Sequence, residues 1–247
     1  MPILLVTGGA RGIGAAVCRM AAARGWDVCI NYQRDQTAAE AVAEDVVASG
    51  RRALTVQADV SDADEVADLF AACERGLGQL DALVASAGLT GRISTLAAAD
   101  PAELATVINV NVTGTLLCCR EAVRCMSGTG GGSGGIIVTL SSAASTLGSP
   151  GEYVWYAASK GAIDSFTQGL AKEVGPEGIR VNAVAPGMTD TEIHAAGGNP
   201  DRPTQIAPTI PLRRVATPEE IAAPILWLLS EEAAYVSGAI LRVAGGR

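Results

Sequence analysis

The stretch "ILLVTGGARGIG", residues 3–14, decides the fold of this chain of 247 residues. It opens with a five-residue apolar run typical of a buried strand, and three glycines follow with the spacing G-x-x-x-G-x-G. Gly8 would let the chain turn, Gly12 would let a phosphate approach the backbone, and Gly14 would let a helix pack on the sheet. Because a helix N-terminus attracts anions, the stretch predicts a nucleotide-binding loop between a strand and a helix.

Short apolar runs alternate with Ala-rich helical patterns along the rest of the chain. The predicted strands cover residues 3–7, 27–31, 53–57, 81–85, 135–140, 179–184 and 239–243. The predicted helices cover residues 12–24, 35–49, 62–77, 101–126, 153–174 and 217–230. Strands that are apolar on both faces and separated by helices indicate a parallel sheet covered on each side. We therefore expect one α/β domain over residues 1–247, a doubly wound, Rossmann-type parallel sheet of about seven strands with helices on both faces.

Local signals refine this outline at two helix starts and one long connection. Ser61 precedes an acidic first turn and Thr217 precedes a proline, so both are predicted N-caps. Residues 188–211, "MTDTEIHAAGGNPDRPTQIAPTIP", are polar and rich in Pro and Gly, unlike the rest of the chain. A loop of this length in a compact domain is usually functional or disordered, and we predict a substrate lid.

Composition excludes several classes of function. The net charge is −8 and the 18 Lys and Arg are scattered, which argues against a nucleic-acid surface. Six cysteines without a C-x-x-C pair and a single histidine, His194, offer little material for a metal site, so we expect none and interpret the thiols as reduced. No apolar run reaches the roughly 18 residues that span a bilayer, and no cationic segment precedes the first strand. We expect a cytoplasmic protein with no membrane partner.

The segment "YVWYAASK", residues 153–160, raises the question of catalysis. On a helix, Tyr156 and Lys160 would lie one turn apart, about 6 Å along the axis. A cation at that distance favours the phenolate by about two pKa units, which would make Tyr156 a useful acid/base group. The alternative is an ordinary amphipathic pair with a snorkelling lysine. Tyr153 lies two turns from Lys160 and is predicted to be a pocket-wall or interface residue.

Taken together, the ordered motifs resemble those of the short-chain dehydrogenase/reductase family, including its 3-oxoacyl-carrier-protein reductases and glucose dehydrogenases. The resemblance covers essentially the whole chain. It rests on "TGGARGIG" (7–14), "ADV" (58–60), "NVNVTG" (109–114), "LSSAAS" (140–145), "YAASK" (156–160), and "VNAVAPG" with "MTDT" (181–191). It implies hydride transfer with a nicotinamide cofactor, for which the protein supplies position and a matched acid.

The resemblance implies four catalytic residues. Tyr156 would exchange a proton with the substrate oxygen, and Lys160 would lower the pKa of Tyr156 and hold the nicotinamide ribose. Ser142 would polarise the substrate carbonyl, and Asn111 would anchor a water relay behind Lys160. Because adjacent strand residues face opposite ways, Ser141 is the alternative to Ser142, and the motif favours Ser142.

The same resemblance implies the residues that hold the cofactor, with Asp59 at the adenine. They are Thr7, Gly8, Arg11, Gly12, Ile13, Gly14, Tyr32, Arg34, Asp59, Val60, Ala87, Gly88, Tyr156, Lys160, Pro186, Gly187, Thr189 and Thr191. An acid about 20 residues beyond the loop would select NAD, but that position falls on the uncharged Tyr32. Arg11 and Arg34 offer cations to a 2′-phosphate, so we predict NADP(H) in preference to NAD(H). If both arginines are merely solvated, NAD or dual use follows.

Two segments depart from the family pattern. "ASAG" (85–88) replaces the usual N-N-A-G and removes an amide from the adenine-side ribose, and "VAGG" (243–246) replaces V-D-G-G at an edge contact. The overall prediction is an NADP(H)-dependent oxidoreductase that interconverts a small-molecule carbonyl and a secondary alcohol. The alternatives are an NAD-dependent alcohol or sugar dehydrogenase of the same family, and a non-catalytic nucleotide-binding sensor. Helices 101–126 and 153–174 are expected to pair in a homo-oligomer, a dimer or a tetramer.

Overall fold

A seven-stranded sheet in the order β3-β2-β1-β4-β5-β6-β7 forms the centre of the computed structural model, which describes residues 1–128 and 131–247. Neighbouring strands in the sheet pair in parallel. The strands are β1 (Ile3–Thr7), β2 (Asp27–Tyr32), β3 (Ala53–Gln57), β4 (Ala82–Ala85), β5 (Gly135–Leu140), β6 (Ile179–Pro186) and β7 (Ile240–Val243). This confirms the predicted doubly wound sheet.

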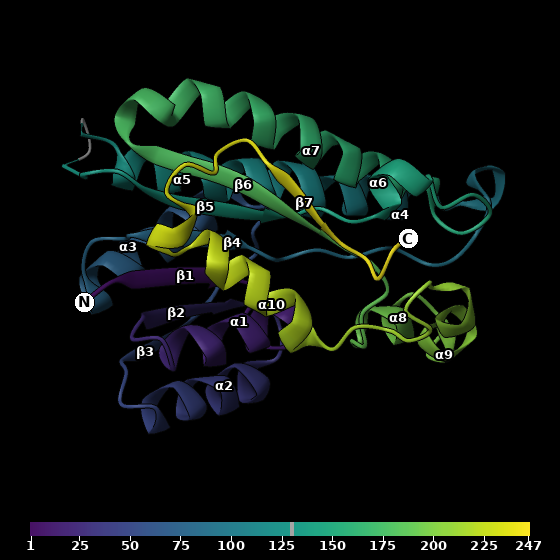
Figure 1. Cartoon of the computed structure of the whole chain (residues 1–247), viewed down its shortest axis with the longest axis horizontal. Helices are drawn as coiled ribbons and strands as arrows, with labels where there is room; N and C mark the ends of the chain where they lie inside the picture. The colour runs from purple at the N-terminus through teal and green to yellow at the C-terminus, as the bar shows by residue number, and fades with distance from the viewer. Residues whose placement is uncertain (129–130) are drawn as a thin grey trace.

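Helices cover both faces of the sheet and enclose one apolar core on each side (Figure 1). One core is covered by α1 (Gly12–Ala22), α2 (Gln36–Ala48) and α10 (Pro218–Leu228), and the other by α3 (Ala63–Leu77), α5 (Thr115–Met126) and α7 (Val154–Val174). Leu4 and Val6 of β1 belong to the first core, and Ile3 and Leu5 to the second. Because successive strand residues point to opposite faces, a strand buried on both sides must be apolar throughout, as β1 is.

Two helix starts test the capping predictions. Thr217 begins α10 with a capping box, in which its hydroxyl accepts from Glu220 N and the Glu220 carboxylate accepts from Thr217 N. The prediction for Ser61 is wrong, because Asp62 is the N-cap of α3 and accepts from Asp64 N and Glu65 N. The Ser61 hydroxyl donates instead to Asp59 Oδ1 at 2.7 Å, so it belongs to the preceding turn.

The predicted single helix over 101–126 is interrupted. It consists of α4 (Pro101–Ile108), a π-helical turn η2 (Asn109–Gly114), and α5. π-helical turns are rare inside α-helices and occur often at functional sites. This one contains Asn111, whose side chain is fully buried.

The same run, Pro101–Met126, is long and apolar enough to cross a bilayer when only length and composition are considered. This corrects the expectation that no apolar run reaches that length. In the structure the run is part of the domain, because α5 packs in the second core and the Asn111 amide donates to Leu89 O and Ser159 Oγ. We therefore interpret it as a helix of the domain.

Residues 188–211 form short helices where we expected an irregular segment. They are α8 (Ile193–Ala196), α9 (Arg202–Ile206) and the 3-10 turn η5 (Ala207–Thr209). Figure 1 shows α8 and α9 next to each other, beyond the end of the sheet at which β6 ends. At its base the segment is joined to Ala216, whose N–H donates to Met188 O and whose carbonyl accepts from Asp190 N.

Candidate active site

The glycine loop after β1 leaves no room for a side chain at Gly8 or Gly14. A Cβ on Gly8, where φ is +62°, would lie 2.9 Å from Ala87 Cα. A Cβ on Gly14 would lie 2.3 Å from Gly8 O, closer than any real contact allows. Gly12 also has a positive φ, +52°. The three glycines therefore fit the roles predicted for them, a turn, a close approach and tight helix packing.

The N-terminus of α1 is open to an anion. Arg11 is its N-cap residue but makes no side-chain capping hydrogen bond, so the first amides of the helix are not satisfied by a side chain. Arg11 is exposed. A pyrophosphate fits this cradle, because backbone N–H groups and the helix dipole both favour negative charge there.

Two buried polar side chains hold the glycine loop in place. The Thr7 hydroxyl accepts from Ser86 N and Ala87 N, both at 3.1 Å. These bonds fix the turn after β4, even though the "ASAG" segment of that turn lacks the asparagine that is usual in the family. Asn31 Oδ1 accepts from Gly8 N at 3.3 Å, while its amide donates to Ala58 O at 3.0 Å. Sequence reasoning missed Asn31, although an asparagine within an apolar strand was a signal.

The predicted adenine end lies at the carboxyl ends of β2 and β3. Burial alone would raise the pKa of Asp59, but hydrogen bonds from Ser61 and Gln33 and the charge of Arg34 hold it below its usual value. Tyr32 is 8% exposed and packs in the first core, so its side chain forms part of the wall of the fold. Arg34 is exposed and, within the described ranges, makes no hydrogen bond. A hollow of about 840 Å³ runs from here along α3, lined by Gln33, Arg34, Val56, Gln57, Asp59, Glu65, Asp68, Leu69, Ala72 and Arg75.

Ser142 and Tyr156 are brought together at the end of β5. The Ser142 hydroxyl lies beside the Tyr156 phenol and lowers its pKa, and Ser142 Oγ also accepts from Ala144 N at 3.1 Å. Ser141 points elsewhere, since its hydroxyl donates to the backbone carbonyl of Lys160 at 3.4 Å. The alternation of the strand therefore places Ser142, and not Ser141, beside the phenol.

Lys160 lies next to Tyr156 but does not set its pKa in the expected direction. The ammonium is 5.8 Å from the centre of the Tyr156 ring and donates to Leu140 O at 2.7 Å. Burial raises the pKa of Tyr156, and the Ser142 hydrogen bond and the charge of Arg202 offset this only in part. Burial also lowers the pKa of Lys160 to about 8, against the charge of Asp164. A less charged lysine is a weaker source of stabilisation for a phenolate, because desolvation disfavours the charged form of both groups.

Asn111 is the fourth predicted catalytic residue and forms, with Ser142, Tyr156 and Lys160, what we call the tetrad. Its side chain bonds to the backbone of Leu89. Its Oδ1 accepts from Leu89 N at 2.9 Å, and its Nδ2 donates to Leu89 O at 2.8 Å. The nearby Gly88 gives the lysine access to this amide, because a Cβ there would lie 3.2 Å from Asn111 Oδ1 and 3.5 Å from Lys160 Nζ. The π-helical turn thus places the Asn111 side chain on the same side of the site as the Lys160 ammonium, with Gly88 next to both.

The remaining predicted cofactor residues surround the same edge of the sheet. Val60 is 6% exposed in the second core, and Ile13 packs against the first. Gly187 follows Pro186 at the end of β6, and a Cβ on it would lie 2.7 Å from Ala244 Cα. The "VAGG" segment therefore packs against the turn after β6, as the predicted edge contact. Thr189 Oγ1 donates to Gly187 O, and the Thr191 methyl would lie 3.2 Å from a Cβ on Gly12.

A second cluster, which sequence reasoning missed, joins the predicted lid to the tetrad. Arg202 of α9 lies over the Tyr153 ring, 5.2 Å from its centre, and forms an ion pair with Glu152. The Tyr153 ring meets the Tyr156 ring edge-on, with centres 5.4 Å apart. A lone arginine in a polar loop carries no periodic signal, so nothing in the local sequence singles out Arg202.

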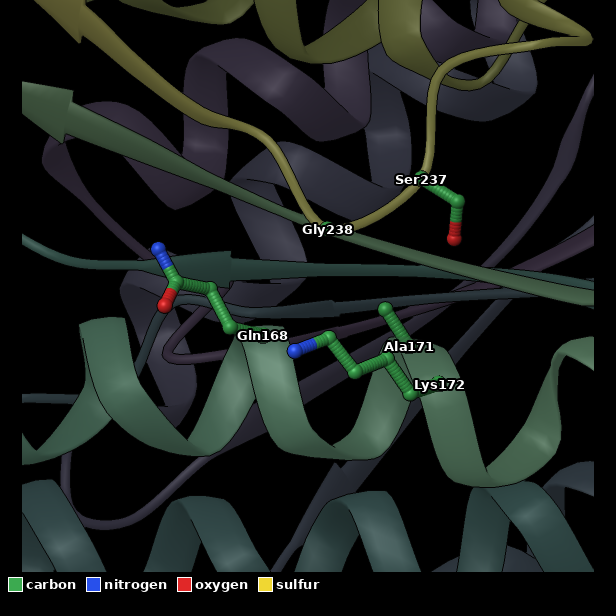
Figure 2. A pocket seen from close by; sticks show the side chains of 5 residues that line it. All are labelled: Gln168, Ala171, Lys172, Ser237 and Gly238. Carbon is green, nitrogen blue, oxygen red and sulfur yellow. The ribbon is translucent and has the colours of Figure 1, made fainter.

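A hollow of about 270 Å³ between α7 and the segment before β7 lies apart from the tetrad (Figure 2). It is lined by Gln168, Ala171, Lys172, Ser237 and Gly238. Two of these residues also form hydrogen bonds to β6: Ser237 Oγ accepts from Val181 N, and Gly238 N donates to Val181 O. We interpret this hollow as part of the scaffold.

Comparisons with known proteins give the family. A family model described as enoyl-(acyl carrier protein) reductase matches residues 8–247. The chain is 48% identical over 247 residues to YgfF, an uncharacterized oxidoreductase of Escherichia coli, covering 100% of both chains. It is 37% identical to a 3-oxoacyl-[acyl-carrier-protein] reductase of Synechocystis, covering 99% of this chain and 96% of the relative.

A solved structure extends the likeness to three dimensions. A short-chain dehydrogenase of Burkholderia cenocepacia in complex with NADP superposes with a TM-score of 0.91 and 34% identity, over 99% of this chain and 97% of that one. Sequence and overall fold agree with these relatives. The chain belongs to the short-chain dehydrogenase/reductase family of oxidoreductases.

Proposed function

We propose that this oxidoreductase interconverts a carbonyl and a secondary alcohol with NADP(H), and that Tyr156 is its general acid/base. Membership of the family already makes the chain a nicotinamide-dependent oxidoreductase that acts on small molecules. The observation that carries the finer proposal is the placement of three groups together: the Ser142 hydroxyl lies beside the Tyr156 phenol and lowers its pKa, and the Lys160 ammonium is 5.8 Å from the centre of the phenol ring. A non-catalytic nucleotide binder would not need these three groups together.

The cofactor, when bound, supplies the hydride. The protein residues position the substrate and move the proton. Ser142 and Tyr156 both present hydroxyls to one point, so a substrate oxygen placed there receives two hydrogen bonds, and Tyr156 passes its proton to that oxygen as negative charge develops. Below its pKa of about 8, Lys160 adds a positive charge next to the phenol, although burial still leaves the pKa of Tyr156 raised. Asn111 donates to Ser159 Oγ, one residue before the lysine.

The preference for NADP(H) over NAD(H) is supported by charge at the end of β2. No carboxylate occupies the family's NAD-selecting position, which is the buried Tyr32. Arg34 and Arg11 are exposed near the openings where a 2′-phosphate and a pyrophosphate fit. An arginine fork recognises phosphate oxygens in pairs, which favours the phosphorylated cofactor.

A turnover screen tests the proposal. NADPH oxidation is followed with carbonyl compounds, beginning with 3-oxoacyl thioesters because of the Synechocystis relative and continuing with sugars and cyclic ketones. For a substrate that is turned over, Tyr156→Phe is expected to lower kcat by about 10² to 10⁴ fold. Tyr235→Phe is the matched control, since Tyr235 is fully exposed. Equal rates in wild type and Tyr156→Phe would remove Tyr156 from the mechanism.

The lid and the assembly state are proposed from the same arrangement. Residues 188–211 follow β6 directly at the edge of the sheet where Ser142 lies, so we assign them the role of the substrate lid. Ile108 and Leu116 are 39% and 38% exposed on the helices predicted to pair, which supports a homodimer or homotetramer. Size-exclusion chromatography that gave a monomer would contradict the assembly. A cytoplasmic location stays a prediction.

A further inference from the structure

Arg202 is a charged residue in an unusual environment. It begins α9 in the proposed lid, yet it is only 8% exposed. Burying a guanidinium is costly unless it is paired and its N–H groups are bonded. The partners of Arg202 therefore define where the lid rests.

The partners come from two segments outside α9. Arg202 Nε donates to Glu152 Oε1 at 3.2 Å and Nη2 donates to Glu152 Oε2 at 2.5 Å. Its Nη1 lies 3.6 Å from Met188 Sδ. Glu152 and Tyr153 immediately precede α7, the helix that carries Tyr156 and Lys160. A second tie, from Ile93 N to Gly197 O at 3.2 Å, joins the lid to the loop after β4.

We propose that Arg202 is a positioning residue that couples the seating of the lid to the catalytic phenol, through Glu152 and the Tyr153 ring. This inference rests on the function proposed above. When the lid is seated, the guanidinium covers Tyr153, whose edge packs against Tyr156, and the cation lies close enough to favour the phenolate. When the lid lifts, both the packing and the charge leave. The acid/base group is thus tuned only while the substrate is enclosed.

The charges around this cluster fix the sign of the effect. The titratable and charged groups next to Arg202 or Tyr156 are Glu152, Tyr153, Lys160 and His194. Beyond them, Arg247 acts on Tyr153 and Asp190 acts on His194. Arg202 lowers the pKa of Tyr156, and Glu152 compensates its charge from the other side. Removing the cation should therefore raise the pKa of Tyr156, and removing its counter-charge should lower it.

The test is a pH profile of kcat for alcohol oxidation, in which the rate rises as Tyr156 loses its proton. Arg202→Met is expected to move this rise upward by roughly 0.5 to 1 pH unit. Arg202→Lys keeps the positive charge, so its pH profile should stay close to that of wild type. Glu152→Gln should move the rise downward. Arg24→Met, at an exposed position after α1, is the matched control and should leave the profile unchanged.

Hydrogen exchange of the lid amides provides a readout that needs no turnover. Arg202→Met is expected to speed exchange over residues 193–209 by about tenfold or more, while exchange in β1 stays as in wild type. Faster lid exchange with an unchanged pH profile in Arg202→Met would overturn the coupling and leave Arg202 a latch only. Shifts of the same sign in Arg202→Met and Glu152→Gln would overturn it as well.

The outcomes for this inference and for the proposed function are separable. If wild type turns over no carbonyl, the proposed function fails, and lid exchange still decides whether Arg202 holds the lid. If wild type is active and Arg202→Met changes neither lid exchange nor the pH profile, the proposed function stands and this inference is wrong. Should Arg202→Met fail to fold, the other two variants decide. A downward shift of the pH profile in Glu152→Gln with a near wild-type profile in Arg202→Lys supports the coupling, and an unchanged or upward-shifted profile in Glu152→Gln overturns it.

Discussion

The two sides of the candidate site are built in different ways. On the proposed cofactor side, the glycine loop is fixed by backbone packed on backbone, with Gly14 against Gly8 and Gly8 against Ala87. On the proposed substrate side, the 188–211 segment rests on side chains, chiefly the Arg202–Glu152 pair. A backbone cradle fits a constant ligand, while side-chain contacts can be exchanged without changing the fold. The difference explains how one scaffold keeps a cofactor and varies a substrate.

The largest expected effect comes from breaking the backbone side. Gly14→Ala places a methyl group 2.3 Å from Gly8 O, where neither segment can move away. We expect a loss of more than about 3 kcal/mol in the free energy of unfolding, together with loss of NADPH binding. Urea denaturation and fluorescence titration measure the two effects.

Gly169→Ala is the matched control for that substitution. Gly169 lies in α7 with open space around its Cβ position. Alanine there should stabilise the protein by about 0.5 to 1 kcal/mol, because alanine favours the helix. If Gly14→Ala behaved like Gly169→Ala, the cradle would be far more tolerant than its geometry indicates.

Lys160 lies between the two sides and makes stability depend on pH. Its pKa is about 8 in the folded protein and near 10.5 when unfolded, because burial disfavours the ammonium. Below pH 8 both states are protonated and the full burial cost is present. As the pH rises from 8 to 10.5, the unfolded state binds more protons, so wild type should gain up to roughly 3 kcal/mol relative to Lys160→Met. Parallel unfolding curves of the two proteins at pH 7 and pH 10 that showed no divergence would contradict this.

A smaller effect is expected at the cofactor edge. Arg34→Ala should weaken NADPH binding by about tenfold and leave NADH binding unchanged, since only the 2′-phosphate is recognised there. Arg75→Ala is the control, because Arg75 lines the same hollow from α3. Equal losses for both cofactors would place Arg34 outside the phosphate site. Calorimetric titration gives both affinities.

The smallest effect is expected on the side-chain-built side, at Tyr153. Tyr153→Phe keeps the ring that Arg202 covers and Tyr156 touches, and the described residues offer its hydroxyl no hydrogen bond. We expect kcat to change by less than about twofold. A large loss would mean that the Tyr153 hydroxyl itself takes part in the reaction, which the measured kcat and KM would reveal.

Sequence alone predicted the sheet well, because burial on both faces leaves an unmistakable apolar run. Each predicted strand lies within one or two residues of an observed one, from β1 to β7. The helix starts were harder, because Ser61 and Asp62 are both good caps and only the fold of the turn decides between them. The helices of the lid are too short to show a helical period.

The motifs predicted the residues of the candidate site. They did not predict the contacts and the burial of those residues, which depend on the folded structure. Ser142 could be separated from Ser141 only by seeing which hydroxyl meets Tyr156. The pKa of Tyr156 was expected to fall, but local spacing does not reveal how much burial opposes the lysine. Asn31 and Arg202 act through contacts with segments far away in the chain. The only local signal for Asn31 is an asparagine within an apolar strand, and Arg202 has none.

The central place of β1 has a consequence for how the chain is made. β1 is synthesised first, yet it pairs with β2 on one side and with β4, Ala82–Ala85, on the other. During synthesis its β4 edge waits for about 75 further residues, with a strand of Ile, Leu and Val unpaired on that side. A parallel pairing this distant is slow to form, and an open apolar edge invites association with other chains. Nascent chains that stop before residue 82 should therefore depend on chaperones more than the complete protein does.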